Sequence, residues 1–392
     1  MYSYSQRLSW SFSSNSLTQL LLEKRAAGIP LLDLTVSNPT RCLLEYPHED
    51  IQKAFGRVPD FTYGPDPFGS HLARSAVADY YCERAISIAS NQLLLTASTS
   101  EAYSLLFKLL CDPGDEVLAP LPSYPLFEYL AALESARMVP YHFRYDGNWY
   151  LDFASLRAQI NQRTKAIIVV NPNNPTGAFL TAEEQGELLH LAKQFCLPII
   201  SDEVFTDYAL TPSARIGKTL IGNESVLSFS LNGLSKAAGM PQMKLAWIAT
   251  GGPAQEQRKA RERLEVITDT YLSVGTPVQH ALPDLLRIGE PIRQQLLRQI
   301  KKNVAVMDSF VAGTAVQRLH LQGGWSAVLQ LPRIMTEEDW VRGLLQEQDT
   351  LVQPGYFFDM ESEAYIVLSL ITPAGEFRAG IEKICLHVSR YS

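Results

Sequence analysis

The sequence predicts an α/β fold in which a mostly parallel sheet lies between helices. Apolar runs with the length of buried strands, such as residues 166–170 and 197–200, alternate with segments of helical periodicity, such as residues 181–196. This alternation is typical of parallel strands joined by crossover helices. Asn174 and Asp202 follow two of these runs, so both are expected at the carboxyl edge of the sheet, where open α/β sheets bind ligands.

The composition is that of a globular protein with a substantial core. Of the 392 residues, 46% are hydrophobic and 19% are charged, and the net charge of −7 contains no long run of one sign. This pattern argues against nucleic-acid binding. No apolar run approaches the ~20 residues that span a bilayer, and no signal-peptide pattern begins the chain, so no membrane partner is expected. Five scattered cysteines without metal-ligand spacing favour a reducing, cytoplasmic location and predict no metal site.

The expected elements alternate along the whole chain. Residues 1–15 are polar and aromatic and are expected to form an arm that is ordered on another surface, such as a second subunit. Further helices are expected at residues 16–27, 72–84, 102–110, 154–162 and 258–266, and further strands at residues 31–36, 93–96, 116–119, 226–231 and 245–250. From about residue 283 the pattern changes to helices at 292–312, 337–347 and 376–388 and strands at 324–331, 350–353 and 365–371. These later elements predict a smaller α+β unit.

Two of the helix starts have the spacing of a capping box. The pairs are Ser98 with Glu101 and Thr181 with Glu184. A purely structural role is one interpretation of the first pair. The same helix start presents hydroxyls and free N–H groups at a positive dipole end, which suits a phosphate.

Lys236 is the candidate for covalent chemistry. It follows the apolar run 226–231, lies among small residues and precedes a second strand, where a desolvated amine can act as a nucleophile. A lone Ser-Lys pair is a weak signal. The combination is more specific, because Asn174-Pro175-Thr176-Gly177, then Asp202, then Ser235-Lys236 occur in this order on successive strand ends.

In this set of motifs the chain resembles the class I/II aminotransferases of pyridoxal-phosphate fold type I, over nearly its whole length. The resemblance implies a large domain with a mostly parallel seven-stranded sheet between helices, and a smaller α+β domain. We expect an N-terminal arm and small-domain segment at residues 1–45, the large cofactor-binding domain at 46–285 and the small C-terminal domain at 286–392. It also implies pyridoxal 5′-phosphate as cofactor, an amino donor and a keto-acid acceptor as substrates, and a homodimer.

The resemblance assigns roles to individual residues. Lys236 is expected to form the Schiff base, Asp202 to face the pyridine nitrogen and Asn174 to donate to the phenolic oxygen. Tyr124 is expected to stack on the ring, and Tyr63 to reach the phosphate of the partner's cofactor. The expected phosphate-binding residues are Ser98, Thr99, Ser100, Ser235 and Lys244. The loop after residue 36, which contains Asn38, is expected at the substrate carboxylate. For most of these residues a turn, a packed ring or a satisfied strand-end carboxylate remains the alternative.

Three positions depart from the family pattern. Phe205 stands where the family usually has a tyrosine that bonds the phenolic oxygen, and Lys244 stands where it usually has an arginine. Most important, Val367 stands where a small-domain arginine binds the substrate α-carboxylate. A valine cannot bind a carboxylate, so either Arg41 replaces the arginine or the charge pattern of the substrate is unusual. Trp325 is expected to make the substrate pocket more apolar.

The predicted function is therefore amino-group transfer through Lys236. A β-eliminating lyase, a decarboxylase of the same fold and a non-catalytic pyridoxal-phosphate module remain alternatives. A Rossmann dehydrogenase is disfavoured because no GxGxxG motif follows a strand.

Overall fold

An eight-stranded sheet forms the centre of the molecule. The computed structural model describes residues 2–8, 15–56, 62–210, 217 and 219–391. The strand order is β2-β9-β8-β7-β6-β3-β4-β5. The strands are β2 (Leu93–Thr96), β3 (Glu116–Leu121), β4 (Arg137–Asp146), β5 (Asn148–Leu151), β6 (Thr164–Val170), β7 (Ile199–Asp202), β8 (Ser228–Gly233) and β9 (Ala246–Gly251). Strands β4, β3, β6, β7 and β8 pair in parallel, whereas β9 is antiparallel to both of its neighbours.

The predicted α/β class is confirmed, and the strand count is extended by one. The seven strands that the family resemblance implied are present, and β5 adds an eighth by pairing antiparallel with β4.

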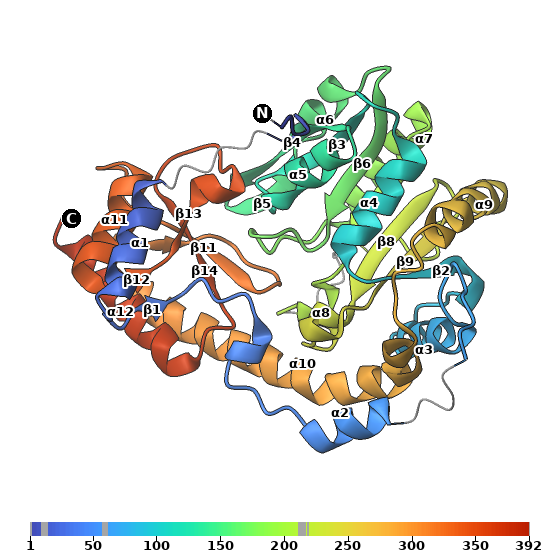
Figure 1. Cartoon of the computed structure of the whole chain (residues 1–392). Helices are drawn as coiled ribbons and strands as arrows, with labels where there is room; N and C mark the ends of the chain where they lie inside the picture. The colour runs from blue at the N-terminus through green and yellow to red at the C-terminus, as the bar shows by residue number, and fades with distance from the viewer. Residues whose placement is uncertain (1, 9–14, 57–61, 211–216, 218, 392) are drawn as a thin grey trace.

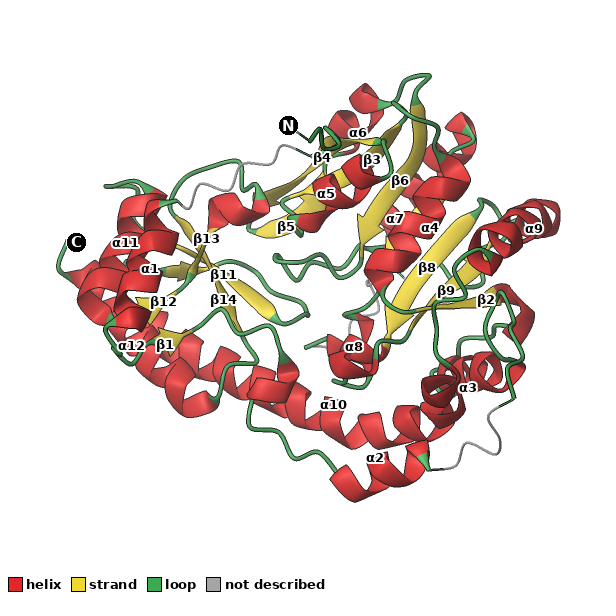
Figure 2. Cartoon of the chain, viewed as in Figure 1, coloured by secondary structure: helices red, strands yellow, loops and turns green. Residues whose placement is uncertain are grey.

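Helices cover both faces of the sheet (Figure 2). On one face lie α4 (Thr99–Leu110), α5 (Leu126–Leu133) and α9 (Ala254–Asp269). On the other lie α3 (His71–Cys82), α6 (Phe153–Gln159), α7 (Ala182–Phe195), the short α8 (Leu234–Ala237) and part of α10 (Thr276–Val311).

Strand β6 shows why the strands read as continuous apolar runs. Its residues Ala166 and Ile168 pack into the core under α4, α5 and α9. The intervening Ile167 and Val169 pack into the core under α6 and α7. Because successive side chains of a strand point to opposite faces, a sheet covered on both faces needs apolar residues at every position.

Side-chain caps set the start of the helices that matter most for the site. Thr181 and Glu184 form the complete capping box predicted for α7. At α4, Ser98 accepts a hydrogen bond from the Glu101 backbone N–H as predicted. The Glu101 carboxylate, however, accepts from the backbone N–H of Ala97 and not from that of Ser98, so the prediction of a full box at α4 was wrong.

A second, smaller layer of strands lies beyond the carboxyl edge of the main sheet. It contains the sheet β10-β11-β14-β13 and the parallel pair β1-β12. These strands are β1 (Leu32–Asp33), β10 (Gln317–Arg318), β11 (Ser326–Gln330), β12 (Thr350–Leu351), β13 (Gln353–Pro354) and β14 (Tyr365–Ser369). The N-terminal helix α1 (Ser16–Ala26) lies among the C-terminal elements α11 (Glu337–Gln348) and α12 (Ala374–Ser389) (Figure 1). The N-terminal segment thus joins the C-terminal elements in one core, as Leu17 and Leu34 show.

Helix α10 connects the two layers along one side of the molecule (Figure 1). It has 36 residues and continues through Pro283 and Pro291. The sequence predicted a long helix from residue 292 and a domain boundary in a helix near residue 285, but not one continuous helix. An internal proline removes a backbone hydrogen bond and usually marks a helix boundary. Helix α2 (His48–Phe55), which was not predicted, packs on α10. Short 3₁₀ segments occur at η1 (Pro39–Arg41), η2 (Ser90–Gln92), η3 (Thr206–Tyr208), η4 (Pro241–Met243) and η5 (Gly355–Phe358).

Most other predicted elements are present within a few residues of their expected bounds. The strand expected at residues 31–36 is reduced to the two residues of β1. Part of the arm expected at residues 1–15 lies outside the described residues, and its docking on a second subunit stays a prediction, as do the domain bounds at residues 45 and 285. Among the described residues, none of the helices has the combination of length and apolar character needed to cross a membrane.

Candidate active site

A cavity of about 390 Å³ lies between the carboxyl edge of the main sheet and the strands β11, β13 and β14. Ten of the predicted site residues line it: Ser98, Thr99, Ser100, Tyr124, Asn174, Asp202, Ser235, Lys236, Lys244 and Trp325. Nine of them come from strands of the main sheet or from the loops and helices between these strands, whereas Trp325 directly precedes β11 of the smaller layer. The fold therefore gathers residues that are up to 227 positions apart in sequence, since Ser98 and Trp325 line one cavity.

Lys236 lines this cavity from the short helix α8, directly after β8. Its Nζ is 4.9 Å from the ring centroid of Trp325 and 5.7 Å from that of Phe205. Burial lowers the pKa of the Lys236 amine, and the nearby Asp202 carboxylate acts in the opposite direction. Because only the neutral amine is a nucleophile, this environment makes Lys236 more reactive than a solvated lysine.

Asp202 ends β7 with a buried carboxyl group. Its oxygens accept hydrogen bonds from the Tyr103 hydroxyl at 3.2 Å and from the Val204 backbone N–H at 3.2 Å. Burial raises the pKa of Asp202 to about 6, although both hydrogen bonds and the charge of Lys236 lower it. A carboxyl group whose pKa is raised by burial stays ionised when a cationic N–H donor lies next to it. A protonated ring nitrogen of pyridoxal phosphate is such a donor, so Asp202 fits the cofactor.

Asn174 is held by the layer opposite its own strand. The Ser326 hydroxyl donates to Asn174 Oδ1 at 3.2 Å, which leaves the Asn174 Nδ2 group as a donor. The loop is fixed by Gly177, whose φ of +68° lies in the left-handed region. A Cβ atom at Gly177 would lie 2.3 Å from the carbonyl oxygen of Gly323, so only glycine fits this close approach.

The first turn of α4 brings hydroxyl groups and a helix N-terminus to the cavity. Ser98 caps the helix, and Thr99 and Ser100 follow with their side chains at the cavity lining. Ser235 and the exposed Lys244 line the same cavity, and Lys244 adopts a left-handed backbone with φ of 50°. A helix N-terminus with hydroxyls and one ammonium group suits a phosphate monoester.

Three predicted residues lie outside the cavity lining. Asn38 Oδ1 accepts hydrogen bonds from the Thr40 backbone N–H at 3.1 Å and from its hydroxyl at 2.8 Å, and Arg41 is exposed in η1. Tyr63 is 75% exposed and lines a separate surface pocket together with Tyr271 and Ser273. The roles that the family resemblance implied for these residues stay predictions.

Several lining residues were missed by the sequence analysis. They are Thr35, Ser37, Ser326, Gln353, Phe358 and Ser369. Ser37 directly follows the strand predicted at residues 31–36 and gave the same signal as Asn174, whereas Thr35 lies inside that predicted strand. Gln353 gave no signal, because its place depends on the pairing of β13 with β14. Phe205 lines the cavity as its position suggested, and Val367 is 1% exposed in β14.

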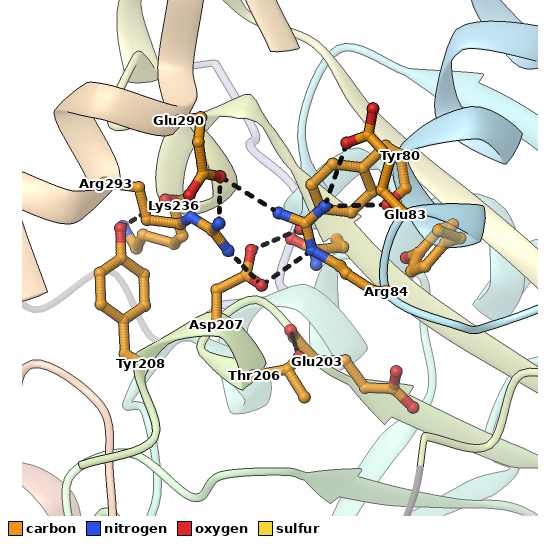
Figure 3. A network of polar contacts seen from close by, with 12 residues as sticks. Tyr80, Glu83, Arg84, Glu203, Thr206, Asp207, Tyr208, Lys236, Glu290 and Arg293 are labelled. Atoms are coloured by element: carbon orange, nitrogen blue, oxygen red, sulfur yellow. Dashed lines mark hydrogen bonds and ion pairs between the residues drawn. The ribbon is translucent and has the colours of Figure 1, made fainter. Parts of the chain in front are cut away.

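Behind Lys236 lies a polar network that the sequence did not indicate (Figure 3). The Tyr208 hydroxyl donates to the backbone carbonyl oxygen of Lys236. Its neighbour Asp207 accepts hydrogen bonds from the hydroxyl of Tyr80, from Nε of Arg84 at 3.1 Å and from Arg293. Both guanidinium groups also pair with Glu290 of α10. The network thus joins α3, η3 and α10 beneath the lysine.

Comparison with known proteins gives the family of the chain. Residues 30–379 match the family description "Aminotransferase class I and II". A relative named glutamate-pyruvate aminotransferase from Haemophilus influenzae is 28% identical over 93% of this chain and 92% of its own. A relative named alanine aminotransferase from Mycobacterium tuberculosis is 26% identical over 92% of this chain and 86% of its own.

Solved structures share the fold over the full length. An alanine aminotransferase from Pyrococcus furiosus has a TM-score of 0.87 at 22% identity, with 99% of this chain and 100% of that chain covered. A single mutant of the aspartate aminotransferase from Thermus thermophilus has a TM-score of 0.85 at 21% identity, with the same coverage. The chain belongs to the aminotransferase class I and II family and is a pyridoxal-phosphate-dependent aminotransferase.

Proposed function

We propose that Lys236 carries the reaction, by binding pyridoxal phosphate covalently and by moving the proton of the amino donor. The observation that supports this role is the position of its amine, which is buried in the cavity near Asp202 with a lowered pKa. A neutral lysine amine in an apolar pocket is suited both to attack on a carbonyl carbon and to proton transfer.

The remaining lining residues hold the cofactor in this proposal. When bound, pyridoxal phosphate supplies an electron-withdrawing ring that stabilises negative charge on the carbon bearing the amino group. Asp202 would keep a proton on the ring nitrogen, and Asn174 would donate to the phenolic oxygen. The start of α4 would hold the phosphate, with the hydroxyls of Ser98, Thr99, Ser100 and Ser235 and the ammonium group of Lys244 as its donors. Tyr124 would stack on the ring.

Once the amino donor has displaced it, Lys236 is free to act as a base. Its Nζ would take up the proton from the α-carbon of the donor, and the ammonium group so formed would later give that proton back. The rings of Trp325 and Phe205 flank Nζ and would keep water away, so that the ammonium group holds this proton between the two transfers.

We also propose a homodimer with sites completed by the partner. Tyr63 is exposed beside Tyr271 and Ser273 and lies outside the lining of its own cavity, as expected for a residue that serves a neighbouring subunit. Light scattering is expected to give twice the chain mass of 43.7 kDa. Co-expression of Tyr63→Phe chains with Lys236→Ala chains tests the sharing. If Tyr63 serves the partner's site, each mixed dimer contains one fully native site and is active. If Tyr63 serves its own site, no site in the mixed dimer is native.

The relatives' names make glutamate and alanine the first donors to test, with pyruvate as the first acceptor. We place the reaction in the cytoplasm. All five cysteines are unpaired thiols, which is typical of proteins in a reducing compartment. Fractionation of cells with an antibody against the chain tests this location, and recovery with secreted proteins would contradict it.

The central experiment locates the covalent bond and the fate of the amino group. Reduction of the yellow protein with borohydride is expected to fix the cofactor on the peptide that contains Lys236, as measured by mass spectrometry. Lys236→Ala is expected to lose this adduct. With donor and acceptor present, the amino group is expected on the acceptor. Release of ammonia or carbon dioxide without an acceptor would instead indicate a lyase or a decarboxylase.

A further inference from the structure

The charges that line the cavity are unevenly distributed. Among the described residues, its charged lining residues are Asp202, Lys236 and Lys244, and all three follow strands of the main sheet. The facing side, which we call the neutral wall, carries no charge in the described part of the chain. The neutral wall consists of Thr35, Ser37, Trp325, Ser326, Gln353, Phe358 and Ser369.

The strand pairing places Gln353 next to the position where the family resemblance implied an arginine. Gln353 in β13 is directly opposite Val367 in β14. Side chains of directly opposite residues in an antiparallel pair lie on the same face of the sheet. Val367 itself packs in an apolar cluster with Phe358 and is 1% exposed, whereas Gln353 reaches the cavity. The polar group nearest in register to the expected arginine is therefore a carboxamide.

The wall groups without a partner among the described residues are the Gln353 carboxamide, the exposed Ser37 hydroxyl and the buried Trp325 indole N–H, and the carboxamide is the half-buried one that can both donate and accept. The Ser326 hydroxyl donates to Asn174, the Ser369 hydroxyl to the Val36 carbonyl oxygen, and the Thr35 hydroxyl to Asp33. The half-buried side chain of Gln353 makes no hydrogen bond with any residue that the structure describes. Its N–H groups and its carbonyl oxygen are both available to a ligand.

A wall of this kind selects against a carboxylate. A carboxylate that enters the cavity loses water and needs a cationic donor, preferably a bidentate guanidinium, to offset that loss. A carboxamide supplies only neutral hydrogen bonds, but it can both donate to and accept from a hydroxyl or an amide. An uncharged group therefore satisfies Gln353 at a smaller desolvation cost.

We propose that Gln353 determines the specificity of this enzyme, and that its amino donor carries an uncharged hydroxyl or carboxamide group where α-amino acids carry the carboxylate. This inference rests on the proposed role of Lys236 for its kinetic test, but not for its binding test. Arg41 is the competing anchor, because it is the cation that the family resemblance made a candidate, although it lies outside the cavity lining.

The kinetic test compares probes that differ only at this group: L-alanine, L-alaninamide, L-alaninol and propan-2-amine. The rate of the first half-reaction is expected to be at least ~10-fold higher per unit concentration for the amide or the alcohol than for alanine. Gln353→Leu is expected to remove this advantage and to leave propan-2-amine unaffected. Val367→Arg is expected to shift the preference toward alanine. Gln317→Leu, in exposed β10 of the same sheet, is the matched control and should change none of these ratios.

The binding test uses non-reacting probes and the wild-type holoenzyme. Calorimetry is expected to give a lower Kd for propanamide than for propanoate, and Gln353→Leu should abolish the difference. Tighter binding of propanoate, together with a preference for alanine that Arg41→Ala removes, would overturn the proposal and identify Arg41 as the anchor. Absence of the borohydride adduct on Lys236 would overturn the proposed role of that lysine, and the Kd ratio would then decide the role of Gln353 by itself.

Discussion

The hydroxyl of Tyr208 lies 2.6 Å from the backbone carbonyl oxygen of Lys236 and donates a hydrogen bond to it. Tyr208 is fully buried, and its ring meets that of Trp325 edge-on with centroids 5.2 Å apart. One side chain therefore supports both the backbone of the reactive lysine and an aromatic ring that flanks its amine.

Tyr208→Phe is expected to leave the carbonyl oxygen of Lys236 without its partner. The loss of a buried hydrogen bond costs about 1–2 kcal/mol of unfolding free energy, which urea titration can measure. The rate of proton transfer should fall with it, because the lysine is less firmly held. Tyr150→Phe removes a hydroxyl from an exposed residue of β5 and is expected to leave both quantities unchanged. Equal effects of the two substitutions would contradict a positioning role for Tyr208.

Asp207→Asn is expected to be strongly destabilising. Asp207 and Arg293 have side chains only 12% and 11% exposed, and Arg84 shares the same carboxylate. Removal of the charge leaves two guanidinium groups facing each other, with the half-exposed Glu290 and the exposed Glu83 as the anions that still pair with them. The loss of a buried charge partner typically costs ~3 kcal/mol or more. Glu83→Gln removes a 78% exposed partner of the same Arg84 and should cost less than about 0.5 kcal/mol. Chemical denaturation of both variants makes the comparison.

Gly177→Ala separates steric overlap from backbone strain. Its Cβ would meet the carbonyl oxygen of Gly323, so the loop that carries Asn174 has to move. Gly147→Ala has a similar φ of +72° with no atom within 4 Å and serves as the control for strain alone, which costs about 1 kcal/mol. Gly177→Ala is expected to lose clearly more stability and also cofactor affinity. A thermal-shift titration with pyridoxal phosphate would show both, and identical behaviour of the two variants would refute the steric argument.

The stability of the cofactor-free protein should depend on pH through Asp202. Its pKa is raised to about 6 in the folded chain, above the value near 4 of an unfolded chain. The protonated carboxyl group therefore favours folding below about pH 4, and this contribution is lost as the pH rises to 6. Relative to Asp202→Asn, the wild type is expected to lose ~3 kcal/mol between pH 4 and pH 7. A constant difference across that range would show that the raised pKa is wrong.

Local sequence patterns predicted most of the helices and strands and part of the lining of the cavity. Buried strands, helix caps and strand-end polar residues leave local signals, and these placed Lys236, Asp202 and Asn174 correctly at one cavity. The sequence analysis missed helices whose position is set by tertiary contacts and not by a local start signal. Helix α10 continues through its prolines because its apolar face is buried, and α5 follows Pro125 without a side-chain cap.

The missed site residues depend on contacts between distant segments. Gln353 reaches the cavity only because β13 pairs with β14 in one register, and Tyr208 meets Lys236 only after η3 has packed under α8. Neither relation leaves a periodic pattern or a motif in the sequence. A register or a packing partner is a property of the assembled fold, so local rules could not supply it.

Helix α10 belongs to two hydrophobic cores at once. Its first half supplies Leu282, Leu285 and Ile288 to the core beside the main sheet, and its second half supplies Leu296 and Ile300 to the core of the smaller layer. If one core unfolds, α10 loses support and apolar residues of the other core become exposed to water. The two layers are therefore expected to unfold cooperatively, as one calorimetric transition whose van't Hoff and measured enthalpies agree. Two separate endotherms would mean that α10 breaks between its halves.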